Sequence, residues 1–433
     1  MRPVNITTTA APGKHHRTLF LAADVSRSTL HLFSRFEHDG ALLTVEDVVP
    51  NLTRPIEGTL RQVRTLAAEH GAPDVCVVCE ASGGYERLLL AVAERLGLGT
   101  ALVSGEQVGA LTKLVSLDTA KTDKKDARLI HLAAASGRLQ RHRRLPERYR
   151  LLRRLTSFHD DEVRLVAGLR TRLLQVLTEL FPDYDRQAQF TFSKTGRVLL
   201  REGLLDPRRL VALGAPRLLR MLRGRVKGVK SATAERLLRA AQASVRTNPL
   251  EAVAAVLSRR LQVLLAEIEQ HEGHAGELRA DIERLGAELK ASGELPPLDE
   301  AVSGLTLFNL ARLVGQTGPL SDFATKRQLL RYAGMNLRER QSGTYRGQTR
   351  LSKKGRPLLR KVLAQAVFPL LRGDRLLGAR YAERRKRMPE RKAKVAAMRK
   401  LLVVVYGAQR SGLRGEPFEA GRVYRCQSQY AAA

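Results

Sequence analysis

Four acidic residues have the types and positions needed to bind divalent cations. Asp24 and Glu80 each end an apolar run, and two further acids lie within Lys121-Thr122-Asp123-Lys124-Lys125-Asp126-Ala127. In a helix Asp123 and Asp126 share a face, with Cβ atoms about 5–6 Å apart. Two carboxylates this close repel each other unless a proton, a cation or solvent separates them. Taken alone, this motif is also compatible with a solvated charged helix face.

The elements that must bring these acids together can be predicted from apolar runs and turn residues. Strands are expected at 18–26, 30–36, 41–45, 74–80 and 100–103, and helices at 56–70, 85–96 and, largely, 106–136. The first three strands should form an antiparallel meander with a turn at Asp39-Gly40. The order β-β-β-α-β-α-β-α indicates an α/β domain with a ribonuclease-H-like mixed sheet and helices on its faces.

In open α/β sheets the ligand site lies beyond the carboxyl ends of the strands, which is where Asp24 and Glu80 fall. The last helix of the domain could bring Asp123 and Asp126 to the same edge. Such a carboxylate set can hold two divalent cations about 3.5–4 Å apart, on the attacking and leaving oxygens of a phosphodiester. Oxygen-only ligands favour Mg²⁺, or Mn²⁺, over zinc.

The charge balance predicts a polyanionic partner. The 433 residues contain 75 Lys and Arg against 43 Asp and Glu, a formal charge of +32. Nucleic acid is favoured over membrane, because the strongly apolar runs, such as 401–406, are far shorter than the ~20 residues of a membrane span. The N-terminus lacks the apolar core of a signal peptide. Cys76 and Cys79 lie in an apolar run without a second ligand pair and are interpreted as core residues of a cytoplasmic protein.

Beyond residue 137 the chain is predicted to be mainly helical. A heptad seam of nearly five repeats predicts self-association or packing on the preceding helices. It runs through Leu257, Leu261, Leu264, Ile268, His271, Ala275, Leu278, Ile282, Leu285 and Leu289. His271, with Gly273 and Gly276 beside it, interrupts the apolar packing in the middle of the seam. This middle part is interpreted as a hairpin bend or a register device. We interpret His271 as a polar core residue rather than a ligand.

Basic residues that are predicted to contact nucleic acid lie in three segments, at 121–125, 141–144 and 338–356. Between 321 and 433 there are 28 Lys and Arg against 7 Asp and Glu. Within this region Ser342-Gly343 lies on an expected loop between arginines, where it is well placed to meet a phosphate. The predicted nucleic-acid-binding residues are Lys121, Lys124, Lys125, Arg141, Arg143, Arg144, Arg338, Arg340, Arg346, Arg350, Lys353, Lys354 and Arg356.

Three of these segments together resemble a known family. Asp24-Val25-Ser26, Glu80-Ala81-Ser82-Gly83-Gly84-Tyr85 and the 121–127 motif look like the signatures of the DEDD insertion-sequence transposases, which include the Piv-type DNA invertases. Ala23 and Arg27 stand where the family usually has Gly and Lys, and Ser104-Gly105 replaces its Asn-Pro pair. The region after 300 resembles the family's second domain, with Ser303-Gly304 in place of Pro-Gly-Ile-Gly.

The resemblance implies a chemistry and a set of partners. Asp24, Glu80, Asp123 and Asp126 would bind Mg²⁺, and Ser342 would attack a DNA phosphate to form a covalent protein–DNA intermediate. Ser352, in a segment similar to the family's Ser/Thr-Lys-x-Gly, is the second candidate nucleophile, although its position suits a helix cap better. The implied partners are double-stranded donor and target DNA, a structured guide RNA, and further copies of the chain in a dimer or tetramer.

The resulting organisation has five parts. We expect a flexible tail at 1–17, a RuvC-like catalytic domain at 18–137, a basic helical linker and coiled coil at 138–295, a serine-bearing transposase domain at 296–410 and a tail at 411–433. Two other functions remain open at this point. One is a metal-dependent, junction-resolvase-like nuclease in which Ser342 has no chemical role, and the other is a non-catalytic nucleic-acid-binding protein.

Overall fold

The computed structural model describes most of the chain: residues 6–10, 18–38, 41–81, 83–115, 123–137, 139–184, 188–247, 251–338, 341–342, 345–347, 349–373, 375–412 and 419. The chain divides into two compact units, Met1–Arg144 and Leu145–Ala433. Within these described ranges there is no helix whose length and apolar character would suit a membrane crossing.

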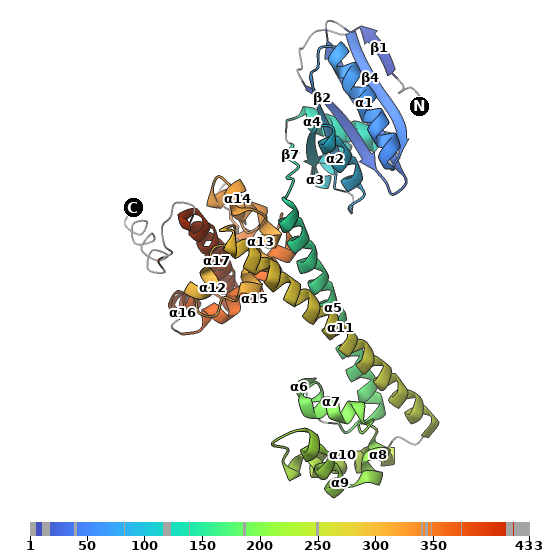
Figure 1. Cartoon of the computed structure of the whole chain (residues 1–433), viewed down its shortest axis with the longest axis vertical. Coiled ribbons are helices and arrows are strands. Elements are labelled where there is room, and N and C mark those ends of the chain that lie inside the picture. Colours follow the sequence, from blue (N-terminus) through green and yellow to red (C-terminus); the bar gives the residue numbers. More distant parts are fainter. Residues whose placement is uncertain are drawn as a thin grey trace. The chain divides into compact units, whose positions relative to one another are not determined.

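The first unit is built on a seven-stranded mixed sheet (Figure 1). Its strands are β1 (Ile6–Ala10), β2 (Thr18–Val25), β3 (Thr29–His38), β4 (Ala41–Pro50), β5 (Asp74–Glu80), β6 (Gly99–Val103) and β7 (Gln140–Arg141). They lie in the order β1-β4-β3-β2-β5-β6-β7, with β2, β5 and β6 parallel to one another. The five inner strands have the ribonuclease-H-like arrangement, which confirms the predicted fold class.

The two edge strands differ from the expectation. Residues 6–10, assigned to a loose tail, pair with β4 from Ile6 opposite Val45 to Ala10 opposite Ala41. Gln140 and Arg141, expected to start the helical linker, pair with Leu102 and Ala101 of β6. Threonine-rich and β-branched segments such as 6–9 suit strands, and added edge strands satisfy backbone groups that would otherwise be unpaired.

Helices cover both faces of this sheet. The helices α1 (Thr53–Glu69) and α2 (Glu86–Arg95) pack on the face that buries Leu19, Leu21 and Ala23 of β2. The helices α3 (Gly105–Val115) and α4 (Asp123–Ala135) cover the other face, in a core that contains Ala22 and Val78. Alternate residues of each strand therefore face different helix pairs.

Cys76 and Cys79 are free thiols in β5. Because they are an odd number of residues apart, they face opposite sides of the sheet, and they cannot form one metal site. Burial raises the pKa of Cys76, and burial followed by the nearby Glu86 carboxylate raises the pKa of Cys79 to about 12. Both thiols are therefore protonated at neutral pH, as core residues would be.

The second unit is mainly helical. The helices α5 (Glu147–Leu180) and α11 (Glu251–Ala291) pack along each other (Figure 1). One core joins them to α6 (Ala188–Thr191), α7 (Lys194–Arg201), α8 (Pro207–Leu213), α9 (Ala215–Arg225) and α10 (Ser231–Thr247). A second core joins them to α12 (Leu298–Ala301), α13 (Leu307–Thr317), η1 (Leu320–Asp322), α14 (Lys326–Tyr332), α15 (Pro357–Val367), η2 (Phe368–Leu371), α16 (Gly378–Arg387) and α17 (Glu390–Gly412).

The heptad seam packs inside the chain, on α5. Leu261 and Leu264 are buried in the first core, and Ile282 and Leu289 are buried in the second. The helix α11 continues without interruption through Gly273 and Gly276, so the hairpin bend considered for the middle of the seam is not present. Neither glycine has a positive φ, so both fit within the helix, as glycine can at a modest cost in backbone entropy.

Candidate active site

Asp24 and Glu80 lie at the same edge of the sheet and face the same side. Asp24 is the second-last residue of β2 and Glu80 is the last residue of β5. These strands are parallel neighbours, in a register that sets Ala23 beside Cys79. Since side chains alternate along a strand, Asp24 shares the face of Ala22 and Glu80 shares the face of Val78. Both carboxylates are therefore on the face covered by α3 and α4.

Two contacts show the direction in which α4 crosses this face. His131 donates its Nδ1–H to the carbonyl oxygen of Phe20 at 3.1 Å. Three residues earlier, the guanidinium of Arg128 lies 5.4 Å from the ring centroid of Phe33, the strand partner of Ala22. Moving back along α4 thus moves forward along β2, toward the strand's carboxyl end. Burial lowers the pKa of His131, so this anchoring ring is neutral at pH 7.

The start of α4 therefore lies toward the edge that carries Asp24 and Glu80. Asp126 is in the first turn of α4, and its half-buried side chain precedes Ala127, which is buried. Asp123 is the first residue of α4, although its side chain and that of Lys124 are outside the described residues. Lys121 and Thr122 also lie outside them, and Lys125 is half-buried.

Gly105, the first residue of α3, makes room for one of these carboxylates. A Cβ at Gly105 would lie 3.3 Å from the carboxyl carbon of Glu80 and closer still to its Oε1. Only glycine leaves this space without moving the acid. The Ser104-Gly105 pair, noted in the sequence as a departure from Asn-Pro, therefore borders the acid set directly.

The donor set fits a hard divalent cation. Asp24, Glu80 and Asp126 offer carboxylate oxygens only, from the ends of two neighbouring strands and the first turn of α4. Their oxygens do not converge within ligand distance of one another in this structure. Carboxylate oxygens are preferred by Mg²⁺ and Mn²⁺, whereas zinc sites usually include Cys or His. No histidine or cysteine is needed to complete such a set.

Ser342 lies in a β-hairpin of the second unit, not on a plain loop. The inner pair of strands is β9 (Gln341–Ser342) and β10 (Tyr345–Arg346), with Ser342 opposite Tyr345. The outer pair is β8 (Leu337–Arg338) and β11 (Arg350–Leu351). Residues 343–344 and the side chain of Ser342 are outside the described residues. The backbone nevertheless puts Ser342 immediately before the tip of the hairpin.

The base of this hairpin is tightly held. Ser352 donates its backbone N–H to the Asn336 carbonyl at 2.9 Å, and the two side chains also form a hydrogen bond. Gly355 packs against the backbone at Gly334, and a Cβ at Gly355 would overlap the backbone atoms of residues 332–334. The helix α15 begins only at Pro357, so the prediction that Ser352 caps a helix is wrong. Its hydroxyl is used to close the hairpin instead.

The predicted nucleic-acid-binding residues occupy different settings. Arg338 and Arg350 face each other across the outer strands and are exposed, as are Lys353 and Lys354. Arg356 is half-buried, and its guanidinium donates to Gln316 at 3.3 Å. Arg340 and the side chains of Arg141 and Arg346 are outside the described residues. Arg143 is half-buried, and Arg144 is exposed and lies 3.7 Å from Glu94.

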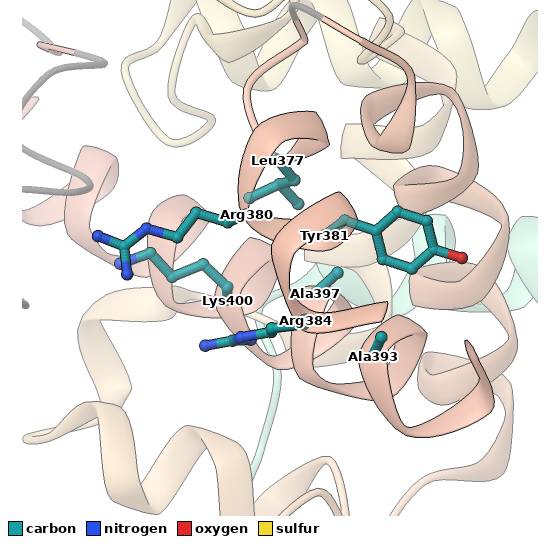
Figure 2. A pocket seen from close by; sticks show the side chains of 7 residues that line it. All are labelled: Leu377, Arg380, Tyr381, Arg384, Ala393, Ala397 and Lys400. Carbon is teal, nitrogen blue, oxygen red and sulfur yellow. The ribbon is translucent and has the colours of Figure 1, made fainter. Parts of the chain in front are cut away.

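A further basic cluster lies in the segment 380–400, whose basic residues indicate a solvated or nucleic-acid-facing helix but not which of them come together. Arg380 and Arg384 of α16 and Lys400 of α17 line one small pocket, and Figure 2 shows the three side chains extending to the same side. Its volume of about 20 Å³ holds roughly one water molecule. The signal in the sequence was the spacing of Arg380 and Arg384 on one helix face, but the approach of Lys400 depends on how α16 packs on α17.

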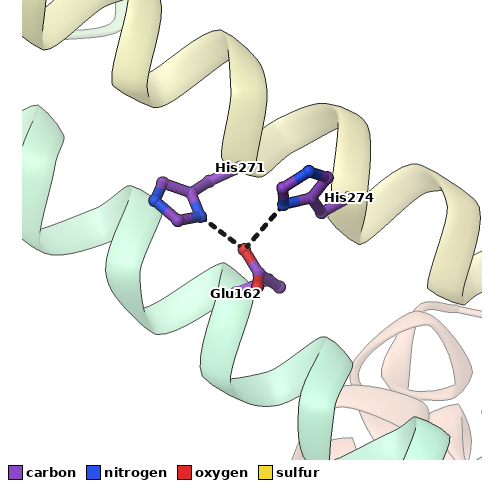
Figure 3. Close-up of side chains that lie close together, drawn as sticks. All are labelled: Glu162, His271 and His274. Atoms are coloured by element: carbon purple, nitrogen blue, oxygen red, sulfur yellow. Dashed lines mark hydrogen bonds and ion pairs between the residues drawn. The ribbon is translucent and has the colours of Figure 1, made fainter.

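A histidine cluster lies between α5 and α11 (Figure 3). Glu162 Oε2 is 2.6 Å from His271 Nδ1 and 4.0 Å from His274 Nδ1. In the part of the chain that the structure describes, no other group of three or more His, Cys, Asp or Glu residues converges in this way. His271 is half-buried at a seam position and has a polar partner across the helix pair, as expected of a register device.

Family models of known proteins match two segments of the chain. Residues 24–182 match a family model described as transposase, of the DEDD type of IS110, and residues 300–382 match the transposase family IS116/IS110/IS902. A solved structure of T. thermophilus RuvC in complex with a Holliday junction substrate is similar at 14% identity, over 29% of this chain and 99% of that one, with a TM-score of 0.21. No curated protein is a significant match.

Proposed function

Because this chain belongs to the IS110-type family of DEDD transposases, we propose that it cuts and rejoins the DNA strands of an insertion sequence through a covalent serine intermediate. The observation that carries the proposal is the acid set. Asp24 and Glu80 end two parallel neighbouring strands of a ribonuclease-H-like sheet, and Asp126 is in the first turn of the helix that packs on the same face, which supports a shared metal site.

In this proposal the acids would hold Mg²⁺, or Mn²⁺, which would stabilise charge at the scissile phosphate. Asp24, Glu80 and Asp126 would be ligands, with Asp123 completing the set. When bound, the cations would draw negative charge from the phosphodiester oxygens. The buried packing of α4 fixes the helix that carries Asp126, and Gly105 leaves space for Glu80. Without the cations the described carboxylates do not converge as one ligand group, so metal binding would have to draw them together.

Ser342 is the proposed nucleophile. Its Oγ would give up its proton and form an Oγ–P bond, while the bond from phosphorus to the leaving DNA oxygen breaks and that oxygen takes up a proton. A DNA hydroxyl from the second strand would then attack the same phosphorus, release Ser342 and restore a phosphodiester. The position of Ser342 beside a hairpin tip, with exposed Arg338 and Arg350 on the strands behind it, supports contact with DNA.

The two compact units and the net charge of the chain indicate which partners the proposed reaction needs. The acids belong to the unit 1–144 and Ser342 belongs to the unit 145–433, so both units must act on one phosphate, within a chain or between copies in a dimer or tetramer. Donor and target DNA would be double-stranded. A structured guide RNA would add a second polyanion, for which the formal charge of +32 provides ample attraction.

A junction assay tests this function. Cells that carry the native locus would express either the wild-type chain or the double variant Asp126→Asn, Ser342→Ala, and element excision or circle formation would be measured by junction PCR. The wild type is expected to give junctions and the double variant none, at equal protein levels. Equal junction yields from both proteins would show that the protein is not the recombinase.

Gly105→Ala provides a finer test of the acid set. The added methyl group would displace the Glu80 carboxylate, so we expect DNA cleavage to fall by about 10–100-fold, the usual cost of misplacing a metal ligand. Cleavage rates of the purified variants would measure this. The control is Gly109→Ala on the same helix, because a Cβ there meets nothing within 4 Å. If the two variants cleave alike, Glu80 is not confined by α3.

A further inference from the structure

Arg312 is a buried cation that forms no salt bridge with a carboxylate of the described residues, although the charge of Asp160 in the same pocket acts on it. Arg312 lies in α13, and its side chain is 3% exposed. One nitrogen, Nη1, donates to Gln365 Oε1 at 2.9 Å, whereas the buried Nε has no hydrogen-bond partner. An arginine charge taken out of water is costly unless an anion or several acceptors compensate it.

A second arginine lies on the same aromatic ring. The Arg279 guanidinium is 4.6 Å from the ring centroid of Phe308, and that of Arg312 is 4.9 Å from it. The Nε of Arg279 donates to Glu283 at 3.1 Å, in an exposed pair on α11. Two guanidinium groups held on one ring produce a strongly positive region with few fixed acceptors.

Both arginines line one pocket of about 380 Å³. Its walls come from α5, α11, α13 and α15, and its polar lining includes His159, Thr306, Asn309 and Gln365. This volume exceeds the needs of a single water or of an inorganic anion. It would hold a phosphate group together with an attached sugar, a size typical of small-ligand pockets.

The single acid in the pocket lining is already engaged. Asp160 accepts from Lys361 at 2.6 Å and from Arg164 at 3.0 Å, and these cations hold the pKa of its carboxyl below the usual range, against the effect of burial. Burial, and then the Arg312 charge, lower the pKa of His159 to about 4, so this ring is neutral at pH 7. Its Nδ1 has no hydrogen-bond partner. The pocket therefore keeps unused polar groups and a net positive charge.

We propose that this pocket between α5, α11, α13 and α15 binds the phosphate group of a nucleic-acid strand. Phosphate oxygens would accept hydrogen bonds from the guanidinium groups of Arg312 and Arg279, which line the pocket, with the sugar filling the remaining volume. Arginine is suited to this because its planar donors match the geometry of a phosphate. The pocket does not depend on the proposed strand chemistry, since neither the acids nor Ser342 line it.

Thermal unfolding of the full chain tests the pocket. The probes would be a 5′-phosphorylated dinucleotide and inorganic phosphate, compared at equal ionic strength. At a concentration well above its Kd, the dinucleotide is expected to raise the Tm of the wild type by at least about 2 °C. Inorganic phosphate is expected to raise it far less. Equal shifts by both probes would mean a free-anion site and would overturn the assignment to a nucleic-acid strand.

The variants make the test specific. Arg312→Met removes a buried charge, so the free protein should be at least as stable as the wild type, yet the dinucleotide shift should vanish. Arg279→Gln, on the more exposed side, should bind at least about tenfold more weakly. Arg284→Gln is the matched control, because Arg284 is exposed on the same helix and pairs with Asp281 at 2.6 Å.

Three results would overturn the proposal. These are a wild-type Tm that no phosphate compound changes, an Arg312→Met variant that keeps the full shift, and an Arg279→Gln variant that binds as tightly as Arg284→Gln. If Arg312→Met does not fold, Arg279→Gln decides the question. The Ser342→Ala variant should retain the shift, so a failure of the strand-transfer proposal leaves this result intact.

Discussion

Ser342→Ala is expected to abolish both the covalent protein–DNA adduct and strand joining, with a loss of at least about 10³-fold. Removing the nucleophile of a covalent mechanism costs this much or more, because the remaining groups have no bond-forming atom to assist. The substitution should not alter folding, since Ser342 pairs through its backbone with Tyr345 in the hairpin. Labelled DNA run on a denaturing gel with the protein would show the adduct directly.

Ser352→Ala is the matched control for this experiment. Ser352 lies in the same hairpin, but its hydroxyl bonds to Asn336 at the base. Losing that bond is expected to cost about 1 kcal/mol of folding free energy and to leave the adduct in place. If Ser342→Ala still joins strands and Ser352→Ala does not, the nucleophile is Ser352. If Ser342→Ala cleaves DNA at the wild-type rate without an adduct, water-driven nuclease chemistry replaces the proposal.

Asp24→Asn is expected to reduce DNA cleavage by at least about 10²-fold while DNA binding is retained. An amide is neutral and holds a hard divalent cation much less tightly than a carboxylate does. DNA affinity depends mainly on Lys and Arg contacts to phosphates, and Asp24 is not one of these. Cleavage measured across a Mg²⁺ and Mn²⁺ titration, beside a gel-shift assay, separates the two effects.

Asp74→Asn serves as the control for charge alone. Asp74 is exposed at the first position of β5, at the opposite end of the strand from Glu80. The Asp74→Asn substitution removes one negative charge from the same sheet, but far from the edge that carries Asp24 and Glu80, so cleavage should be unchanged. An Asp24→Asn protein with the same cleavage and metal dependence as Asp74→Asn would show that Asp24 is not a metal ligand needed for cleavage.

Much of the first unit could be predicted because its determinants are local. The strands at 74–80 and the helix at 56–70 follow from short apolar patterns and their turn residues, and the structure has them at Asp74–Glu80 and Thr53–Glu69. Side-chain alternation along β2 and β5 then decides which face Asp24 and Glu80 share. The edge strands β1 and β7 were missed because their pairing depends on residues far away in the chain.

In the second unit, too, the sequence predicted the pattern within a helix but not the surface on which the helix packs. The heptad period of α11 predicted an apolar seam, and two partners were equally compatible with it: another copy or the preceding helices. Only the tertiary structure shows that the seam packs on α5. Likewise, glycines 273 and 276 left a bend open, and the continuous helix excludes it.

The sequence alone determined that the chain is strongly basic and that its first part folds as a ribonuclease-H-like sheet in which Asp24 and Glu80 end two strands. Net charge and hydrophobic periodicity can be read from the residues without knowing how the elements pack. What only the tertiary structure decided are contacts between residues distant in sequence: Glu80 against Gly105, Ser352 with Asn336, and Arg312 with Arg279 over Phe308. Such contacts depend on how whole elements pack, and no local pattern encodes them.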